Sequence, residues 1–163
     1  MRRRDFITLA GGAAVWPSLI QAQQAERVRR VGVILPAASD DAEYQSWLGA
    51  FLQALAQLNW TIGRNLGVDI YWATADAANI SKHAAELVAL APDVVVAAGT
   101  STVGPVLQAT RTIPVVFPTV VDPVGAGFVD SLARPGGNAT GFLLYEYSLG
   151  GKGSNCLNAS RPA

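Results

Sequence analysis

Short apolar runs alternate along this chain with longer stretches in which apolar residues recur every three or four positions. The apolar runs cover residues 30–35, 66–73, 93–98, 113–117 and 138–144, and the first, third and fourth are rich in valine and isoleucine. Runs of this length and composition predict β-strands, and the run at 93–98 (DVVVAA) is typical of a strand buried on both faces.

Helices are predicted between these strands. Apolar residues of the first helix recur at three- and four-residue steps, the spacing of one helix face that packs on a sheet. These residues are Tyr44, Trp47, Leu48, Phe51, Leu52, Leu55 and Leu58. Ser39, Asp40 and Asp41 offer N-caps for this helix, and Asp76 or Asn79 offers one for the second helix.

Four or five strand–helix repeats with short loops predict an α/β fold, a Rossmann-like parallel sheet with helices on both faces. Such a sheet binds ligands at the carboxyl ends of its strands. The loops expected at this edge are residues 36–41, 74–77, 99–102 and 118–123.

The strongest candidate site is the start of the third helix, where Gly99 is followed by Thr100, Ser101 and Thr102. Hydroxyls and free backbone N–H groups at a helix N-terminus attract a carboxylate or phosphate. The alternative is that Thr100 or Ser101 is only the N-cap of the helix. Ser39, after the first strand, is a weaker candidate of the same kind.

Thr119 and Asp122 follow the fourth predicted strand. A carboxylate at this position is able to receive an ammonium group, whereas an aspartate in a proline-containing loop commonly caps a turn.

Trp47, Trp60 and Trp72 are predicted to pack in the core, with an aromatic ligand pocket as the alternative.

The sequence predicts no catalytic residues, no metal site and no cofactor. His83, the single histidine, falls on the inner face of the second helix, where a packed side chain is more typical than a base. No G-x-G-x-x-G follows the first strand and no Walker loop is present. Cys156 is the single cysteine, which excludes an internal disulfide.

The first 25 residues are predicted to be an export signal peptide of the twin-arginine type. Residues 1–7 (MRRRDFI) form a basic start, and an apolar, small-residue stretch follows to position 20. The alternative is a membrane anchor, but this stretch is shorter than the roughly 20 residues that span a bilayer. We therefore expect a periplasmic protein.

Charge and composition indicate a globular chain that does not bind nucleic acid. Half of the residues are hydrophobic, and lysine plus arginine equals aspartate plus glutamate at 12 each. Residues 1–25 hold three arginines and one aspartate, so the remainder carries a net charge of −2. A slightly acidic surface of this kind is not suited to a nucleic-acid partner.

Three stretches of the chain resemble a known family. They are residues 32–65 (GVILPAASDDAEYQSWLGAFLQALAQLNWTIGRN), residues 83–142 (from HAAELVALAPDVVVAAGTSTVGPV to ARPGGNATGF) and residues 145–152 (YEYSLGGK). Together they resemble the periplasmic substrate-binding proteins of ABC importers, of the tryptophan- and tyrosine-binding type. The resemblance covers residues 28–152.

The resemblance implies a type I periplasmic-binding-protein fold, in which two Rossmann-like lobes close about a hinge around a small ligand. Residues 26–152 would be the first lobe. Its part of the cleft would come from the matching loop residues Ser39, Thr100, Ser101, Thr119 and Asp122. The implied partners are a small amino-acid-like ligand, aromatic amino acids among the candidates, and an ABC permease in the membrane.

Residues 153–163 (GSNCLNASRPA) depart from the family, whose members continue with something like W-L-E-L-L-K-E-I-A-P-G. One base restored ahead of the codons for this segment permits most of those residues, with arginine or cysteine at the position of the second glutamate. We therefore expect residues 153–163 to be an out-of-frame tail, and the chain to be a truncated, weakly binding or non-functional fragment.

Two other functions share this architecture. One is the effector-binding lobe of a transcriptional regulator, which would ordinarily carry a DNA-binding helix pair in place of an export leader. The other is a flavodoxin-like enzyme, for which the sequence supplies neither a base, a nucleophile nor a metal cluster.

Overall fold

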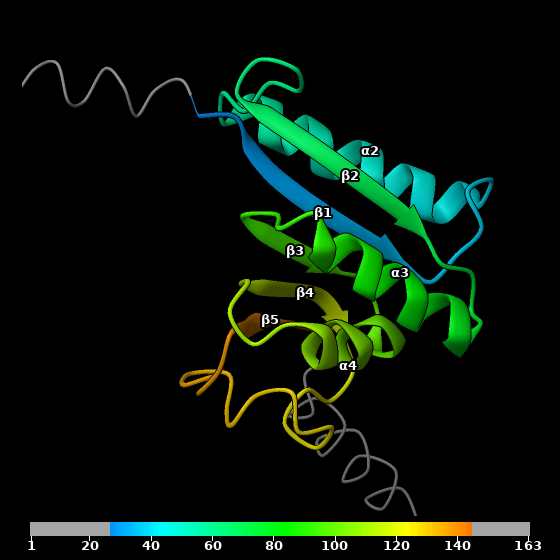
Figure 1. Ribbon diagram of the computed structural model, residues 1–163, viewed down its shortest axis with the longest axis vertical. Coiled ribbons are helices and arrows are strands. Elements are labelled where there is room, and N and C mark those ends of the chain that lie inside the picture. The colour runs from blue at the N-terminus through cyan, green and yellow to red at the C-terminus, as the bar shows by residue number, and fades with distance from the viewer. Residues whose placement is uncertain (1–26, 145–163) are drawn as a thin grey trace, which may run out of the picture.

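The computed structural model describes residues 27–144, so the predicted leader (1–25), residues 145–152 and the predicted tail (153–163) lie outside the described residues. Strands and helices alternate until the last two strands (Figure 1). The elements are β1 (Arg29–Leu35), α2 (Ala42–Gln57), β2 (Leu66–Trp72), α3 (Ala77–Ala89), β3 (Val94–Ala97), α4 (Thr100–Ala109), β4 (Val115–Val120) and β5 (Ala139–Leu143).

The five strands form one parallel sheet in the order β2-β1-β3-β4-β5, which confirms the predicted fold class. Val31 in β1 is aligned with Val68 in β2 on one side and with Val94 in β3 on the other. The chain moves outward from β1 to β2 and then returns past β1 to β3. The direction of winding therefore reverses between β1 and β3, where open sheets of this class bind ligands.

Helices α3 and α4 cover one face of the sheet, and α2 lies on the other (Figure 1). The main core lies under α3 and α4, where Ile80, Leu87 and Val106 pack against strand residues such as Ile34 and Phe117, all 2% exposed or less. The continuous apolar run of β1 is explained by this central position, because residues 31–35 are all buried. The prediction that the run at 93–98 is buried on both faces was wrong for β3, where Val95 and Ala97 are buried but Val94 and Val96 are only half-buried.

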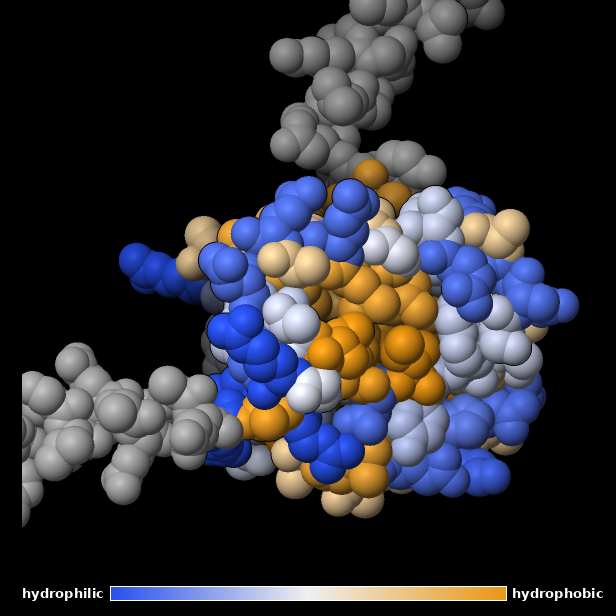
Figure 2. Space-filling model, turned by 90° about the horizontal axis from the view of Figure 1, so that it is seen from above, coloured by the Kyte–Doolittle hydropathy of each residue, from blue (hydrophilic) through white to orange (hydrophobic). Residues whose placement is uncertain are grey.

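Helix α2 covers its face only in part. Tyr44, Phe51 and Leu55 pack against a smaller cluster that includes Val33 and Leu35 of β1, yet no residue of α2 is fully buried. Seen from above, the side on which β2 and α2 lie in Figure 1, hydrophobic residues gather in one patch with hydrophilic residues around it (Figure 2).

The predicted core packing of the tryptophans was wrong for two of the three. Trp47 is 43% exposed and Trp60 is 37% exposed, whereas Trp72 packs against the cluster beneath α2. The spacing of Trp47 does place it on the apolar stripe of its helix. It stays exposed because the cluster beneath α2 extends only from β2 and β1 to Val94 and Val96 of β3, and Trp47 borders the groove that remains over Val116 and Phe142.

The predicted boundary of the fourth strand also needs correction. β4 continues through Pro118 and Thr119 to Val120, so Thr119 is a strand residue and not a loop residue. Proline has no N–H to give to a neighbouring strand. The ladder with β5 accommodates it by shifting register between Phe117 and Val120, after which Leu144 N donates to the Val120 carbonyl at 2.9 Å.

Two aspartates fix the starts of α2 and α3. Asp41 accepts hydrogen bonds from Glu43 N and Tyr44 N, at 3.0 and 3.1 Å, and Asp76 accepts one from Asn79 N at 2.9 Å. These bonds satisfy N–H groups that have no partner within the helix.

Among residues 27–144, no helix is long and apolar enough to cross a membrane.

Candidate functional site at the carboxyl edge of the sheet

The carboxyl ends of three strands, β1, β3 and β4, meet at Gly99. Its N–H donates to Thr119 Oγ1 at 3.2 Å, which joins the end of β3 to β4. A Cβ atom at Gly99 would lie 3.4 Å from Cγ of Pro36, which follows β1. Gly99 also has a φ of 78°, a conformation that favours glycine. The ends of β1, β3 and β4 therefore form one continuous surface beside the point where the winding reverses.

Helix α4 begins at this surface without a side-chain cap. Gly99 is its N-cap residue, and no side chain in the described part of the chain replaces the aspartates that cap α2 and α3. Thr100 and Ser101 in the first turn are exposed. The N-terminus carries partial positive charge and unsatisfied N–H groups, so this start is suited to an anion such as a carboxylate.

Thr102, the third hydroxyl of this segment, has a structural role. Its side chain is completely buried, and Oγ1 donates to the carbonyl of Ala98 at 2.8 Å or to that of Gly99 at 3.0 Å. This contact holds the first turn of α4 against the end of β3. The hydroxyls that face outward are therefore those of Thr100 and Ser101.

The other predicted site residues, Thr119, Ser39 and Asp122, differ from one another in exposure and in hydrogen bonding. Thr119 is half-buried and contacts Gly99 directly. Ser39 is exposed in the loop between β1 and α2, where its carbonyl accepts a hydrogen bond from Gln45 Nε2 at 2.6 Å. Asp122 accepts a hydrogen bond from Gly125 N at 2.7 Å, so it caps a turn, the alternative considered from the sequence. The structure thus brings Thr100, Ser101 and Thr119 together.

The sequence placed Gly99 and the loop that begins at Pro36 at this edge, but it did not predict their contact. Gly99 and Pro36 are far apart in the chain, so no local pattern could show that they meet. Sequence reasoning also missed the contact on α2 between half-buried Tyr44 and exposed Trp47, whose ring centroids lie 5.0 Å apart. Burial raises the pKa of the Tyr44 hydroxyl, and the carboxylates of Asp41 and Glu43 raise it further.

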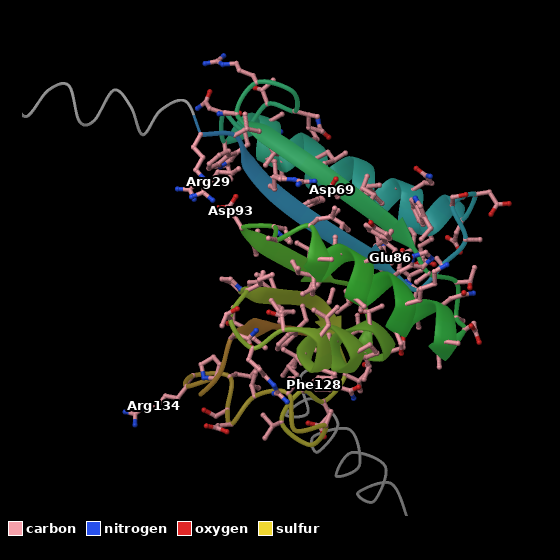
Figure 3. All side chains as sticks on the ribbon, in the orientation of Figure 1. Arg29, Asp69, Glu86, Asp93, Phe128 and Arg134 are labelled. Carbon is pink, nitrogen blue, oxygen red and sulfur yellow. The ribbon has the colours of Figure 1, made fainter. Side chains whose placement is uncertain are left out.

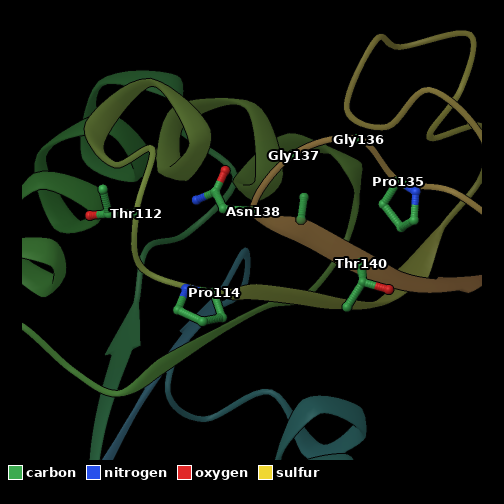
Figure 4. Close-up of a pocket in the computed structure, with 8 residues that line it drawn as sticks. Thr112, Pro114, Pro135, Gly136, Gly137, Asn138 and Thr140 are labelled. Carbon is green, nitrogen blue, oxygen red and sulfur yellow. The ribbon is translucent and has the colours of Figure 1, made fainter.

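A hollow at the opposite, amino edge of the sheet is structural. Its lining includes Thr112, Pro114, Gly137 and Asn138, with no charged side chain (Figure 4). Asn138 Nδ2 donates to the carbonyl of Ile113 at 2.7 Å, so the amide joins the segments that enter β4 and β5. No polar side chain of this hollow is arranged for chemistry.

Charged residues also gather at the amino edge, where Arg29 and Asp93 lie next to each other (Figure 3). Asp93 accepts from Arg29 Nη1 and from the Arg30 backbone N–H, both at 2.9 Å, and Arg27 lies 3.1 Å away. The Arg30 N–H, followed by the Arg29 side chain, lowers the pKa of the Asp93 carboxyl. These contacts tie the start of β1 to the residue before β3.

The described residues carry no arrangement that favours catalysis. No group of three or more histidine, cysteine, aspartate or glutamate side chains within 27–144 could hold a metal ion. His83 is part-buried on α3, where Nδ1 lies 3.0 Å from Glu86 Oε2 and the ring lies against Tyr71. Open α/β sheets of this kind commonly bind small molecules at the carboxyl edge, where the uncapped start of α4 lies.

Comparison with known proteins identifies the family. Residues 30–145 match the ABC transporter substrate binding proteins, and the chain belongs to that family. The family consists of substrate-binding proteins of ABC transporters and not of enzymes. The predicted resemblance is confirmed.

Relatives and solved structures agree with this assignment. The tyrosine-binding protein of Clostridioides difficile (strain R20291) is 34% identical over 95 residues, which are 58% of this chain and 28% of the relative. The ABC domain from Streptococcus pneumoniae in complex with L-Trp has a TM-score of 0.66 at 25% identity, over 71% of this chain and 38% of that structure. The ligand-free, open structure of CD0873, a substrate binding protein from Clostridium difficile, has a TM-score of 0.65 at 26% identity, over 70% of this chain and 38% of its own. The chain thus spans well under half of these proteins.

Proposed function

We propose that this chain captures a small, amino-acid-like ligand in the periplasm and that it serves an ABC importer. The observation that carries the proposal is the convergence of the β1, β3 and β4 ends at Gly99, next to the uncapped start of α4. This surface offers N–H groups and hydroxyls for a ligand carboxylate. Export through residues 1–25 and delivery to an ABC permease belong to the same proposal.

The proposed contacts follow from the chemistry of each side chain. The first-turn N–H groups of α4 and the hydroxyls of Thr100 and Ser101 receive the carboxylate. Thr119 holds Gly99 in place and presents its hydroxyl from β4, and Ser39 lies on the neighbouring loop. Asp122 keeps acceptor capacity beyond its turn contact for an ammonium group. The relatives that bind L-Trp or are named for tyrosine support an amino-acid ligand.

The affinity for a ligand depends on how much of the ligand's surface the protein encloses. Residues 27–144 form a single lobe, and a ligand held against one lobe loses less surface to solvent than a ligand enclosed between two. We therefore propose that this chain alone binds its ligand only weakly. Micromolar affinity in calorimetry with aromatic amino acids would contradict that part of the proposal.

The binding surface is tested by amide NMR spectra of the 163-residue chain during titration with L-tryptophan and L-tyrosine. We expect concentration-dependent shifts confined to the amides of Gly99, Thr100 and Ser101 and their neighbours. Tryptamine has the indole and amine of tryptophan but no carboxylate, so it should leave these amides unchanged. Equal shifts with tryptamine would exclude a carboxylate site, and shifts centred elsewhere would place the ligand on another surface.

Two threonine variants test the role of the β4 hydroxyl. Thr119→Val removes the acceptor for the Gly99 N–H, and we expect the shifts with L-tryptophan to become smaller by several-fold. Thr112→Val makes the same change at an exposed position on the opposite edge of the sheet. It should leave the titration unchanged. An equal response of the two variants would show that Thr119 has no special part in binding.

A further inference from the structure

The loop between β2 and α3 contains a threonine in an unfavourable backbone conformation. Thr74 has a φ of 45°, in the left-handed region. A β-branched side chain is crowded by the backbone in this region, so threonine is strained there. Glycine adopts the same conformation without this strain, as Gly63 and Gly99 do elsewhere in the described residues. The backbone alone would therefore favour glycine at position 74.

Two other non-glycine residues of the described chain have a positive φ, and both have local explanations. Asn59, at 66°, follows the end of α2, and asparagine tolerates this region better than most residues. Ala91, at 48°, follows the end of α3, where its N–H donates to the Val88 carbonyl at 2.9 Å. Thr74 ends no helix, so its conformation needs a different reason.

The hydrogen bonds of Thr74 fix its position and leave its side-chain oxygen able to accept. Its N–H donates to the Ala37 carbonyl at 3.3 Å, which joins the end of β2 to the loop after β1. Its Oγ1 donates to the Ala73 carbonyl at 2.7 Å. This bond uses the single hydrogen of the hydroxyl, so the lone pairs of Oγ1 remain acceptors. Asn79 Nδ2 lies 3.5 Å from Oγ1, too far for a strong hydrogen bond.

The strand order places Thr74 in one row with the proposed binding surface. The carboxyl ends of β2, β1, β3 and β4 lie side by side, and Thr74, Ser39, Thr100 and Asp122 follow them in that order (Figure 1). Adjacent strands are about 5 Å apart, so the ends of β2 and β3 are separated by about 10 Å. A ligand with its carboxylate at the start of α4 and its ammonium group toward Asp122 would extend its side chain across β1 toward Thr74.

We propose that Thr74 is a specificity-determining residue, with Oγ1 accepting a hydrogen bond from the far end of the ligand side chain. The inference rests on the proposed function. It narrows the ligand to amino acids whose side chain ends in an O–H or N–H donor, such as tyrosine, in preference to phenylalanine. Glycine at position 74 would remove the strain but would supply no acceptor. Strained residues of this kind persist at binding sites, where function outweighs their cost in stability.

Amide NMR titrations of the 163-residue chain with L-tyrosine and L-phenylalanine test the proposal. From the shifts of the Gly99, Thr100 and Ser101 amides, we expect the native chain to bind L-tyrosine about three- to tenfold more tightly, the range for one hydrogen bond. Thr74→Gly should abolish this preference. Thr74→Ser keeps the hydroxyl and should retain it.

Urea denaturation without ligand gives a second readout. Thr74→Gly should move the unfolding midpoint to higher urea, because glycine adopts the left-handed conformation without strain. Ala91→Gly is the matched control, since it removes a positive φ from a non-glycine residue at the opposite edge of the sheet. It should also raise the midpoint, but it should leave the preference for L-tyrosine unchanged.

The possible failures are distinguishable. A native chain that binds the two amino acids equally, or a Thr74→Gly variant that keeps the preference, would overturn this inference and leave the carboxylate site standing. A Thr74→Gly midpoint that stays the same or falls would overturn the strain on which the inference depends. The absence of shifts with either amino acid would overturn the proposed function, and this inference with it.

Discussion

Gly32 in β1 allows α3 to approach the sheet closely. A Cβ atom at this position would lie 2.5 Å from Cδ1 of Leu87, which is fully buried. We expect Gly32→Ala to lower the free energy of unfolding by about 1–3 kcal/mol, because added atoms in a packed core force side chains and backbone to shift. Urea denaturation followed by far-ultraviolet circular dichroism measures the change.

Gly49 in α2 is the matched control for this substitution. A Cβ atom there would meet nothing within 4 Å. Gly49→Ala should raise the free energy of unfolding by about 0.5–1 kcal/mol, because alanine loses less backbone entropy than glycine in a helix. A Gly32→Ala variant as stable as the native chain would show that Leu87 moves aside freely.

At the scale of the element, the start of α2 depends on a single side chain. Asp41 accepts hydrogen bonds from two first-turn N–H groups, whereas Asp40, the neighbouring candidate from the sequence, is exposed and caps nothing in the described structure. We expect Asp41→Ala to cost about 0.5–2 kcal/mol of stability in urea denaturation.

Asp40→Ala provides the comparison, since it removes the same charge one residue earlier. It should change stability by less than about 0.5 kcal/mol, as is usual for surface positions without specific contacts. If the two alanine variants were equally stable, the benefit of Asp41 would be a general effect of negative charge near the helix start and not a cap.

At the scale of the whole molecule, Asp93 makes folding stability depend on pH. Its pKa is lowered in the folded state from the ordinary value of 3.8, mainly by the Arg30 N–H and then by Arg29. A lowered folded pKa means that the stabilisation is fully present above the unfolded pKa and is lost as pH falls through the folded pKa. Native stability should therefore decrease below about pH 4.

The variant Asp93→Asn isolates this contribution. The stability difference between the native chain and Asp93→Asn, measured by urea denaturation, should be largest at neutral pH and should shrink below pH 4. Asp40→Asn removes an exposed carboxylate without these contacts and should show a pH profile parallel to that of the native chain. A difference that stays constant through the acid range would exclude the proposed titration of Asp93.

Much of the fold was predictable because the pattern that specifies it is local. Valine-rich runs mark central parallel strands such as β3, and helical spacing marks α2 and α3. The candidate site was predictable at Thr100 and Ser101 because a glycine and hydroxyls at a helix start are also a local signal. The contact between Thr119 and Gly99 was not, because it joins residues 20 positions apart.

The sequence by itself determined the alternation of strands and helices, the parallel sheet, the candidate N-caps of two helices and the resemblance to ABC transporter substrate-binding proteins, since each of these depends on residue types at short separations. Only the tertiary structure decided that β4 extends through Thr119, that Asp122 closes a turn, and that Trp47 and Phe142 line an open groove. These features depend on which parts of the sheet the helices cover, and no local spacing encodes that coverage.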